Sequence, residues 1–376
     1  MKHTYLMTPG PSPLAPEVKL ALAKDILHHR TEAFRNILKD VHEGLKYVFQ
    51  TNNPVLILAS SGTGAMEASV VNFLSKKDKV LVVSGGKFGE RWQEICKRYD
   101  LEVIVIEVEW GKAPSIDEIK NILDKNKDIK AVFTTLCETS TATVYDVEKI
   151  AKVVSQTSAI LVVDAISGLG ADKIKTDDWA VDVVVSGSQK SLMLPPGLSF
   201  VSISKKAEQL MESSNLPKYY LDLKKALKAY AKDDTPYTPS VSLIVALKEV
   251  LEIIKKEGIE NIWEKFDKIS KALREALKSL GFEIYSSSPS SAVTAVVVGD
   301  ISAKKIVSGI RNEFGISIAA GQDKIADKII RIAHMGYINA QDVVMTLSAL
   351  EKTLKDLGVK INLGDSVKRF QEVYYV

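Results

Sequence analysis

The chain has 376 residues, of which 46% are hydrophobic and 26% charged, and its formal net charge is +3. A chain of this length can bury a substantial core, and the composition is that of an ordinary globular enzyme rather than a disordered or fibrous protein. The few excess positive charges are spread along the chain, so nucleic acid is not an expected partner.

Cysteine, histidine and apolar patterning exclude further classes. The only cysteines, Cys96 and Cys137, are too few for a disulfide framework or a zinc site, and the five histidines have no metal-ligand spacing. No apolar run is as long as a membrane span, and residues 1–4 do not begin a signal-peptide pattern. We therefore expect a cytoplasmic protein with no metal and no membrane partner.

Residues 1–16 carry four of the twelve prolines, three of them within residues 9–13. Proline fixes its own φ and has no N–H to donate, so this stretch predicts an extended N-terminal arm. Helices are expected from about Glu17 and over residues 32–50.

From residue 54 the pattern alternates between apolar runs and helical segments. Continuous Val, Ile and Leu runs that alternate with helices are typical of a parallel sheet covered on both faces. Ligands bind such sheets beyond the carboxyl ends of the strands, which selects the loops at 60–63, 84–86 and 135–139, and Asp164. The expected strands are 55–59, 80–83, 102–108, 130–135, 159–164 and 181–186, and the expected helices are 63–75, 88–99, 115–125 and 146–156.

After residue 205 the chain becomes rich in lysine, and its pattern changes. Residues 205–232 are expected to be helical with an interruption at Pro217, residues 235–239 form a rigid turn, and one helical tract covers 241–280. The expected strands that follow are 282–285, 292–298, 316–319 and 328–333, with helices at 302–313 and 340–357. We predict an N-terminal arm (1–16), a large domain (17–255) and a smaller C-terminal α/β domain (256–376).

Lys190 stands in the loop Ser-Gly-Ser-Gln-Lys, between the apolar run 181–185 and a second apolar stretch that starts at Leu198. Most lysines are solvated surface residues, and that is the alternative interpretation. A lysine beside buried strands must be paired or lose its proton, and a neutral amine can form a Schiff base with an aldehyde. We interpret Lys190 as the lysine that carries pyridoxal phosphate.

Asp164 ends the fully apolar run 160–163. It could simply cap a helix or stabilise a turn. The functional interpretation is a carboxylate that partners the pyridine nitrogen, because that contact keeps the nitrogen protonated and the ring able to accept electrons.

The stretch Ser-Ser-Gly-Thr-Gly at 60–64 joins a strand to a helix. The free N–H groups at a helix N-terminus suit a phosphate, and Gly62 and Gly64 allow close approach. A dinucleotide site is the alternative, but Glu67 stands where that motif has its third glycine or alanine, and the next strand ends in Ser84 instead of an acidic residue. The phosphate of a smaller cofactor fits better.

Two further residues could contact ligands. Phe88 follows a glycine pair and could stack on a planar ring, although an isolated phenylalanine is more often part of the core. Arg331 lies inside the apolar strand 328–333, where its charge must meet an anion. That anion is either a structural carboxylate or the carboxylate of a substrate, gripped by two parallel hydrogen bonds.

On these residues the chain resembles the class V aminotransferases of the pyridoxal-phosphate fold type I superfamily, and within them the serine–pyruvate and alanine–glyoxylate aminotransferase branch. The resemblance covers essentially the whole chain, and its most specific part is the Ser-Gly-Ser-Gln-Lys loop followed by Pro-Pro-Gly at 195–197. The other matching stretches are 8–12, 61–63, 138–141, 163–164 and 331–332.

The resemblance implies an α/β fold with a large domain that holds a mostly parallel seven-stranded sheet, and a small domain built from both ends of the chain. It implies a homodimer with active sites at the subunit interface. One departure is Ala142, where the branch usually has glycine. The implied roles are Schiff-base lysine for Lys190, pyridinium partner for Asp164, ring stacker for Phe88, phosphate contacts for Ser61, Gly62, Thr63 and Gln189, a ring contact for Thr139, substrate contacts for Gly10 and Arg331, and contacts of Tyr237 and Thr238 with the partner subunit's cofactor phosphate.

The expected activity is transfer of an amino group from a small L-amino acid, alanine or serine, to glyoxylate or pyruvate. Arg331 recognises only the carboxylate that all donors share, so aspartate stays an alternative donor if a distant residue such as Arg30 enters the pocket. A cysteine desulfurase-like lyase is another alternative, but both cysteines precede residue 140 and Phe88 replaces the histidine usual over the ring. A nicotinamide-dependent oxidoreductase, which rests on Gly62 and Gly64 alone, and a non-catalytic subunit are the remaining alternatives.

Overall fold

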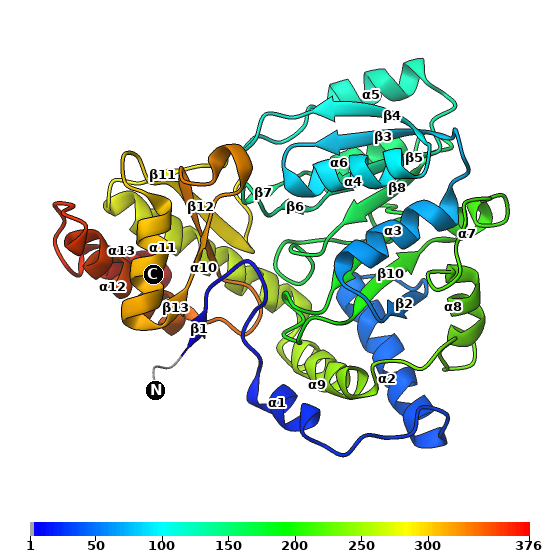
Figure 1. Cartoon of the computed structure of the whole chain (residues 1–376), viewed down its shortest axis with the longest axis horizontal. Coiled ribbons are helices and arrows are strands. Elements are labelled where there is room, and N and C mark those ends of the chain that lie inside the picture. Colours follow the sequence, from blue (N-terminus) through cyan, green and yellow to red (C-terminus); the bar gives the residue numbers. More distant parts are fainter. Residues whose placement is uncertain (1–3) are drawn as a thin grey trace.

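The computed structural model describes residues 4–376 as two α/β parts that lie side by side (Figure 1). The larger part is built on a seven-stranded sheet, and the smaller part on a four-stranded sheet with the C-terminal helices. The predicted seven-stranded, mostly parallel sheet is thus confirmed, and a smaller α/β unit does follow it.

The strands of the large sheet are apolar along their whole length because both faces are covered. Phe133 packs into one hydrophobic cluster and its neighbour Val132 into another, as expected for residues that point to opposite faces. Only the strand at 199–203 runs antiparallel to its neighbours. In order across the sheet the strands are β2 (Val55–Leu58), β10 (Ser199–Ile203), β9 (Val183–Gly187), β8 (Ile160–Asp164), β5 (Ala131–Thr135), β3 (Lys79–Ser84) and β4 (Glu102–Glu107).

Helices cover both faces of this sheet (Figure 1). One hydrophobic cluster joins the sheet to α3 (Gly62–Phe73), α4 (Lys87–Arg98), α7 (Lys205–Leu210) and α8 (Leu223–Tyr230). The other cluster joins it to α1 (Pro16–Leu22), α2 (Glu32–Phe49), α5 (Ile116–Lys125), α6 (Val147–Val154) and α9 (Val241–Glu257), and it continues into the smaller part.

The smaller part is an antiparallel sheet flanked by helices. The expected strand 316–319 is divided into two short strands that belong to different sheets. Its sheet has the order β11 (Glu283–Ile284), β12 (Val293–Val297), β15 (Ile329–Ala333) and β14 (Ala319–Ala320), and its helices are α10 (Ile259–Ser279), α11 (Ala303–Phe314), the short 3-10 helix η1 (Asp323–Ile325), α12 (Ala340–Asp356) and α13 (Asp365–Tyr374).

The N-terminal arm joins this smaller part. Strand β1 (Tyr5–Leu6) pairs in parallel with β13 (Ile316–Ser317), although more than 300 positions separate them in sequence. Residues 1–3 of the predicted arm lie outside the described residues. Both ends of the chain therefore meet in the smaller part, as the resemblance implied.

The expected helical tract over 241–280 is broken in the structure at Gly258. This glycine has a φ of +87°, which is outside the helical region and open mainly to glycine, so α9 ends there and α10 begins with a new direction. The prediction of one uninterrupted tract was wrong because it gave this glycine no weight. The proposed domain boundary between residues 255 and 256 falls in the last turn of α9 and stays a prediction.

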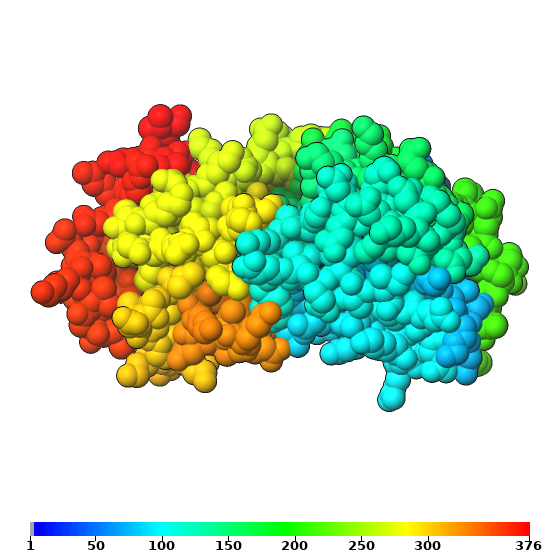
Figure 2. Space-filling model, turned by 90° about the horizontal axis from the view of Figure 1, so that it is seen from above, coloured from blue at the N-terminus to red at the C-terminus, as the bar shows by residue number. Residues whose placement is uncertain are grey.

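The two parts are in direct contact beside the carboxyl ends of the large sheet. Figure 2 shows residues near 280–300, in yellow, packed against the cyan segment of the large part. Backbone hydrogen bonds join them, from Val144 to Ser288 and from Ser287 to Gly111. The hairpin of β6 (Cys137–Glu138) and β7 (Thr143–Val144) lies at this junction. Among the residues that the structure describes, no helix combines the length and apolar character needed to cross a membrane.

Candidate active site

The predicted lysine loop follows β9 directly and is held by Ser188. The buried Ser188 hydroxyl donates to the carbonyl of Pro195 (2.7 Å) and accepts from the N–H of Leu198 (3.2 Å). These two hydrogen bonds tie the loop back to the start of β10. Ser188 is therefore a structural residue, and it fixes where the lysine can lie.

Lys190 lies at the end of this loop against the N-terminal arm. Its amine donates to the carbonyl of Pro9, and a Cβ added to Gly10 would lie 2.5 Å from the lysine Nζ. Only a residue without a side chain lets the arm pass so close. The hydroxyl of Ser12 donates to the Lys190 carbonyl (2.6 Å), so the arm holds the lysine backbone as well. The predicted substrate residue Gly10 thus lies directly beside Nζ.

Burial lowers the pKa of Lys190 to about 8. The nearby positive charges of Arg331 and Arg91 also lower it, while Cys137 and Asp164 act in the opposite direction. A lysine with this pKa has a substantial neutral fraction near physiological pH, and the neutral amine is the form that can act as nucleophile or base.

Asp164 is buried at the end of β8, next to β9, and pairs in register with Val185. One carboxylate oxygen accepts from the N–H of Ile166 (2.8 Å). Burial raises the pKa of Asp164 to about 7, and Lys190 is one of the charges that lower it, so the two side chains lie within electrostatic reach of each other. A buried carboxylate with so little support is ready for a cationic partner, such as a protonated ring nitrogen.

The predicted anion site lies at the start of α3. Ser61 is the N-cap residue and makes no side-chain cap, and the N–H of Gly64 donates to the Ser61 carbonyl (2.8 Å). The N–H groups of Gly62 and Thr63 lack an intrahelical partner and can face a ligand. A Cβ on Gly62 would lie 2.4 Å from Cδ1 of Ile166, so only glycine lets the helix start pack against the residues after Asp164. The hydroxyl of Thr63 accepts from Nη1 of Arg91 (3.3 Å).

Gln189 adds an unsatisfied polar atom beside this helix start. An ideal Cβ on Gly187 would lie 3.1 Å from Oε1 of Gln189 and 3.7 Å from the Cα of Gly62, which places all three residues together. Oε1 of Gln189 is buried and has no hydrogen-bond partner among residues 4–376. A buried polar atom without a partner calls for a ligand or water. An amide oxygen only accepts, as phosphate oxygens do, so Gln189 fits a phosphate when its carboxamide is rotated to present the NH2 group. Together with the start of α3, these residues then fit a phosphate group.

Phe88 lies in the first turn of α4, and its ring is half-buried. The guanidinium of Arg91 lies over this ring, with Cζ 5.0 Å from the ring centre. Because Arg91 also contacts Thr63, it links the ring to the proposed phosphate site. Sequence reasoning missed Arg91; its position one helical turn after Phe88 is a signal that could have found it.

Glu138 is a second residue that sequence reasoning missed, and it holds Phe88 in place. It is fully buried, its Oε2 accepts from the N–H groups of Phe88 (3.1 Å) and Gly89 (3.0 Å), and its Oε1 accepts from the N–H (3.2 Å) and hydroxyl (2.6 Å) of Ser140. A Cβ on Gly86 would lie 2.5 Å from the carboxylate carbon. Glu138 therefore caps α4 from the neighbouring loop. A carboxylate within a stretch of hydroxyl residues was the available signal.

Thr139 and Arg331 meet in the same region. The hydroxyl of Thr139 donates to Ser167 (2.7 Å), and its carbonyl accepts from Nη1 of Arg331 (3.0 Å). Nε and Nη2 of Arg331 both donate to the carbonyl of Ala320 (3.1 and 2.9 Å). Burial lowers the pKa of Arg331 to about 10. A guanidinium has five N–H donors, so two stay free for a ligand. Ala142, three residues further on, has a φ of +57°, a conformation that explains why related sequences would use glycine there.

Tyr237 and Thr238 line a second cavity together with Ala59 and Leu198, which lie next to the start of α3 and to the lysine loop. The hydroxyl of Tyr237 donates to the carbonyl of Tyr219 (3.0 Å), its ring stacks on Tyr220, and Thr238 is exposed. Arg30, the candidate for a second substrate arginine, pairs with Asp234 at this same place. Within one chain, none of the interactions described for these residues reaches Lys190.

The cysteines have no features of a reactive site. Cys96 and Cys137 are both buried, and burial raises the pKa of each thiol. A thiol that stays protonated is a poor nucleophile, which argues against the desulfurase alternative.

Among residues 4–376, no group of three or more His, Cys, Asp or Glu side chains is arranged as a metal site.

Sequence comparison gives relatives over nearly the full length. A protein named soluble hydrogenase, small subunit, from Synechococcus sp. (strain PCC 6716) is 44% identical, with 94% of this chain and 93% of that protein aligned. The L-aspartate–glyoxylate aminotransferase of Paracoccus denitrificans is 33% identical (98% and 96% aligned), and the serine–glyoxylate aminotransferase of Methylorubrum extorquens is 32% identical (97% and 94% aligned).

Structure comparison agrees with these relatives. The ureidoglycine–glyoxylate aminotransferase of Bacillus subtilis superposes with a TM-score of 0.96, at 27% identity, with 100% of this chain and 99% of that chain covered. The family model described as aminotransferase class-V matches residues 5–345. Together with a buried lysine, a carboxylate on the adjacent strand and an open helix N-terminus that fit pyridoxal phosphate, these matches place the chain in the class V aminotransferases, as a pyridoxal-phosphate-dependent transaminase.

Proposed function

We propose that this transaminase transfers the amino group of alanine or serine to glyoxylate or pyruvate. The observation that carries the proposal is the buried guanidinium of Arg331, which among residues 4–376 is bound only to the carbonyls of Ala320 and Thr139. Two free N–H donors beside Lys190 suit one carboxylate, and every amino acid and 2-oxo acid has one. The relatives that are named serine–glyoxylate aminotransferase support the same substrate class.

In this proposal each residue of the site has one task. Arg331 binds the α-carboxylate of the substrate, and Gly10 leaves room for it beside the lysine. Burial lowers the pKa of Lys190 to about 8, which gives Nζ a substantial neutral fraction. In the neutral form it accepts the proton from Cα of the amino donor, and it returns a proton in the second half of the reaction. Bound pyridoxal phosphate supplies the electron sink for the charge that develops at Cα.

The remaining residues hold the cofactor. Asp164 keeps the ring nitrogen protonated, and Phe88 stacks on the ring, fixed by Glu138. Thr139 lies near the ring hydroxyl. The N–H groups at the start of α3, together with Ser61, Gly62, Thr63 and Gln189, bind the phosphate.

Aspartate is a second candidate donor because of Arg91. This arginine contacts Thr63 and the ring of Phe88, and its charge acts on both Lys190 and Asp164. A guanidinium within electrostatic reach of the lysine could take a second carboxylate, and one relative is named L-aspartate–glyoxylate aminotransferase.

A panel of amino donors against glyoxylate, pyruvate and 2-oxoglutarate tests both candidates. We expect the highest kcat/KM for alanine or serine with glyoxylate or pyruvate, and little change of donor preference in Arg91→Lys. If aspartate is preferred and Arg91→Lys selectively lowers kcat/KM for aspartate, the second candidate holds. If no donor reacts although the cofactor band shifts on binding, the substrate class is wrong.

We also propose that the enzyme is a homodimer whose sites are shared, with Tyr237 and Thr238 reaching the cofactor phosphate of the partner subunit. The exposure of Thr238, and its place in a cavity that Ala59 next to the start of α3 also lines, support this. Mixing inactive Lys190→Ala with an inactive Tyr237→Phe/Thr238→Ala variant should restore activity, because one site of each hybrid dimer then has both sets of residues. Mixtures that stay inactive while hybrids form would reject shared sites. The cytoplasmic location expected from the sequence stays a prediction, which cell fractionation would test.

A further inference from the structure

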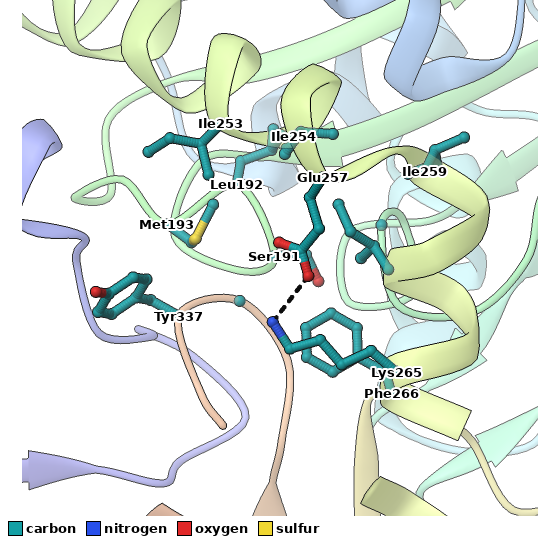
Figure 3. A pocket seen from close by; sticks show the side chains of 13 residues that line it. Ser191, Leu192, Met193, Ile253, Ile254, Glu257, Ile259, Lys265, Phe266 and Tyr337 are labelled. Atoms are coloured by element: carbon teal, nitrogen blue, oxygen red, sulfur yellow. Dashed lines mark hydrogen bonds and ion pairs between the residues drawn. The ribbon is translucent and has the colours of Figure 1, made fainter. Parts of the chain in front are cut away.

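A cavity lies behind the turn that follows Lys190 (Figure 3). It has a volume of about 80 Å³ and opens to solvent on one side. The turn forms one wall, the end of α9 and the start of α10 form the opposite wall, and Gly336 and Tyr337 close a side. None of the residues assigned to the cofactor or the substrate lines this cavity, although Lys190 directly precedes Ser191 in the chain. The cavity is therefore separate from the site described above.

The walls of this cavity are mostly apolar. Leu192, Met193, Ile254, Ile259 and Phe266 are each at most 5% exposed, and their side chains line it. Apolar walls of this kind are typical of sites for small organic molecules.

One polar atom inside the cavity is unsatisfied. The hydroxyl of Ser191 is buried, lines the cavity and has no hydrogen-bond partner among the described residues. Figure 3 shows Ser191 between the apolar side chains of the turn and those of the two helices. A buried hydroxyl can both donate and accept, so it would recognise a hydroxyl or amide group of a ligand.

The charged residues at the cavity already satisfy each other. Nζ of Lys265 and Oε1 of Glu257 form an ion pair at 3.0 Å, drawn as a dashed line in Figure 3. A charged ligand would gain a partner only by breaking this pair. A neutral ligand leaves the pair intact and needs only the apolar walls and Ser191.

We propose that this cavity binds a small neutral amphipathic molecule, such as a phenol or a branched alcohol, with its hydroxyl group on Ser191 and its apolar body between the turn and the two helices. The main contribution is burial of apolar surface, and the hydrogen bond sets the orientation.

Such a ligand would be coupled to Lys190 through the backbone. The N–H of Met193 donates to the carbonyl of Lys190 (2.9 Å), and Met193 itself has a φ of +51°, so the turn is tightly constrained. A ligand that shifts Leu192 or Met193 therefore moves the peptide that carries the lysine. This coupling rests on the proposed role of Lys190, whereas binding itself does not.

Titration of the holoenzyme with 4-fluorophenol, followed by ¹⁹F NMR, tests the site. We expect saturable binding that weakens about tenfold in Ser191→Ala, the loss of one hydrogen bond, and disappears in Ile253→Trp, where the larger side chain fills the cavity. Matched controls are Ser270→Ala, a buried hydroxyl on α10 outside the cavity, and Val245→Trp on α9; both should bind as the wild type does.

Absence of saturable binding, or binding that Ser191→Ala and Ile253→Trp leave unchanged, would overturn the proposal. If Ile253→Trp does not fold, the comparison of Ser191→Ala with Ser270→Ala decides alone. The same titration on protein without cofactor separates this result from the proposed function, because the cavity should bind whether or not transamination is observed. Coupling to Lys190 predicts a shift of the cofactor absorption band at saturation; an unshifted band would reject the coupling alone.

Discussion

Two buried carboxylates in different parts of the molecule differ in how many hydrogen bonds they accept from the chain. Glu351 of α12, 2% exposed, accepts hydrogen bonds from the N–H groups of Gly364 (2.6 Å) and Ser366 (2.7 Å) and from the Ser366 hydroxyl (2.6 Å). Asp164, at the carboxyl end of the central strand β8 and 4% exposed, accepts one hydrogen bond from the N–H of Ile166. Among the described residues, Glu351 thus accepts three hydrogen bonds, whereas Asp164 accepts one.

The difference separates a structural carboxylate from one that needs an external partner. Glu351 caps the N-terminus of α13 and so joins the last two helices. Asp164, with its pKa raised to about 7 by burial, stays costly to ionise until a cation arrives. If this distinction holds, removing a site group should cost activity and removing Glu351 should cost stability.

The largest effect is expected for Lys190→Ala. Without the amine, the proton at Cα has no acceptor, so kcat should fall by a factor of about 100 to 10,000 or more, and the cofactor should no longer be attached covalently. Stability should change little. Steady-state kinetics and the absorption spectrum check this, with Lys248→Ala, a surface lysine of α9, as control. Normal turnover in Lys190→Ala would refute the assignment.

For Glu351→Ala we expect a loss of stability without a loss of activity. Three donors lose a charged acceptor in a buried place, so the free energy of unfolding should fall by roughly 2–4 kcal/mol while kcat per folded molecule is kept. Urea unfolding measures the loss, and Glu249→Ala, which removes a half-buried glutamate of α9, is the control. A free energy of unfolding equal to that of the control would contradict the structural role of Glu351.

The pH dependence of stability in Asp164→Asn tests whether the Asp164 carboxylate is costly to ionise. The folded pKa of Asp164 is raised to about 7 from 3.8, so the folded state holds the proton more tightly than the unfolded state, and wild-type stability is lost as the pH rises between these values. In cofactor-free protein, Asp164→Asn should therefore gain about 2 kcal/mol over the wild type between pH 5 and pH 8. Urea midpoints at both pH values measure this difference. If the two proteins differ in stability by the same amount at both pH values, the pKa of Asp164 is not raised in the folded state.

Glu138→Gln sharpens the distinction because Glu138 lies at the site yet is satisfied by the chain. An amide turns one acceptor into a donor that faces N–H groups, so Phe88 should loosen and the Kd for pyridoxal phosphate should rise about tenfold. Stability should fall as well. Fluorescence titration with the cofactor measures the affinity, and Glu94→Gln, exposed on the same helix, is the control. Unchanged affinity would make Glu138 a purely structural residue.

The smallest effect is expected for Asp323→Asn, which removes an exposed carboxylate from Lys87. This pair (2.6 Å) joins η1 to the start of α4 across the two parts. Because both side chains are partly solvated, the loss should be less than about 1 kcal/mol and should shrink further in high salt. Unfolding in low and high salt checks this. A larger loss would mean that exposed ion pairs rival the buried carboxylates.

The sequence was most informative where burial and local pattern coincide. Apolar strands with a lysine or a carboxylate at their carboxyl ends predicted that Asp164 and Lys190 share a site, because parallel strands end at one edge. The order of the strands could not be predicted, nor that β10 runs antiparallel, since both depend on long-range packing. Lone residues such as Arg91 become meaningful only once α3 and α4 lie side by side. Glu138 was noticed only as part of a motif, because two of the N–H groups that it accepts from belong to Phe88 and Gly89, about 50 positions away in the sequence.

The pairing of β1 with β13 has a consequence for how the protein matures. The arm that touches Lys190 is made first, but its partner strand leaves the ribosome only after residue 317. Contacts so distant along the chain form late, because a long loop must close before they can. A nascent chain could thus have its large sheet assembled while the Lys190 amine still lacks the carbonyl of the arm. If Lys190 is the catalytic lysine as proposed, competence for chemistry would be among the last properties acquired during synthesis.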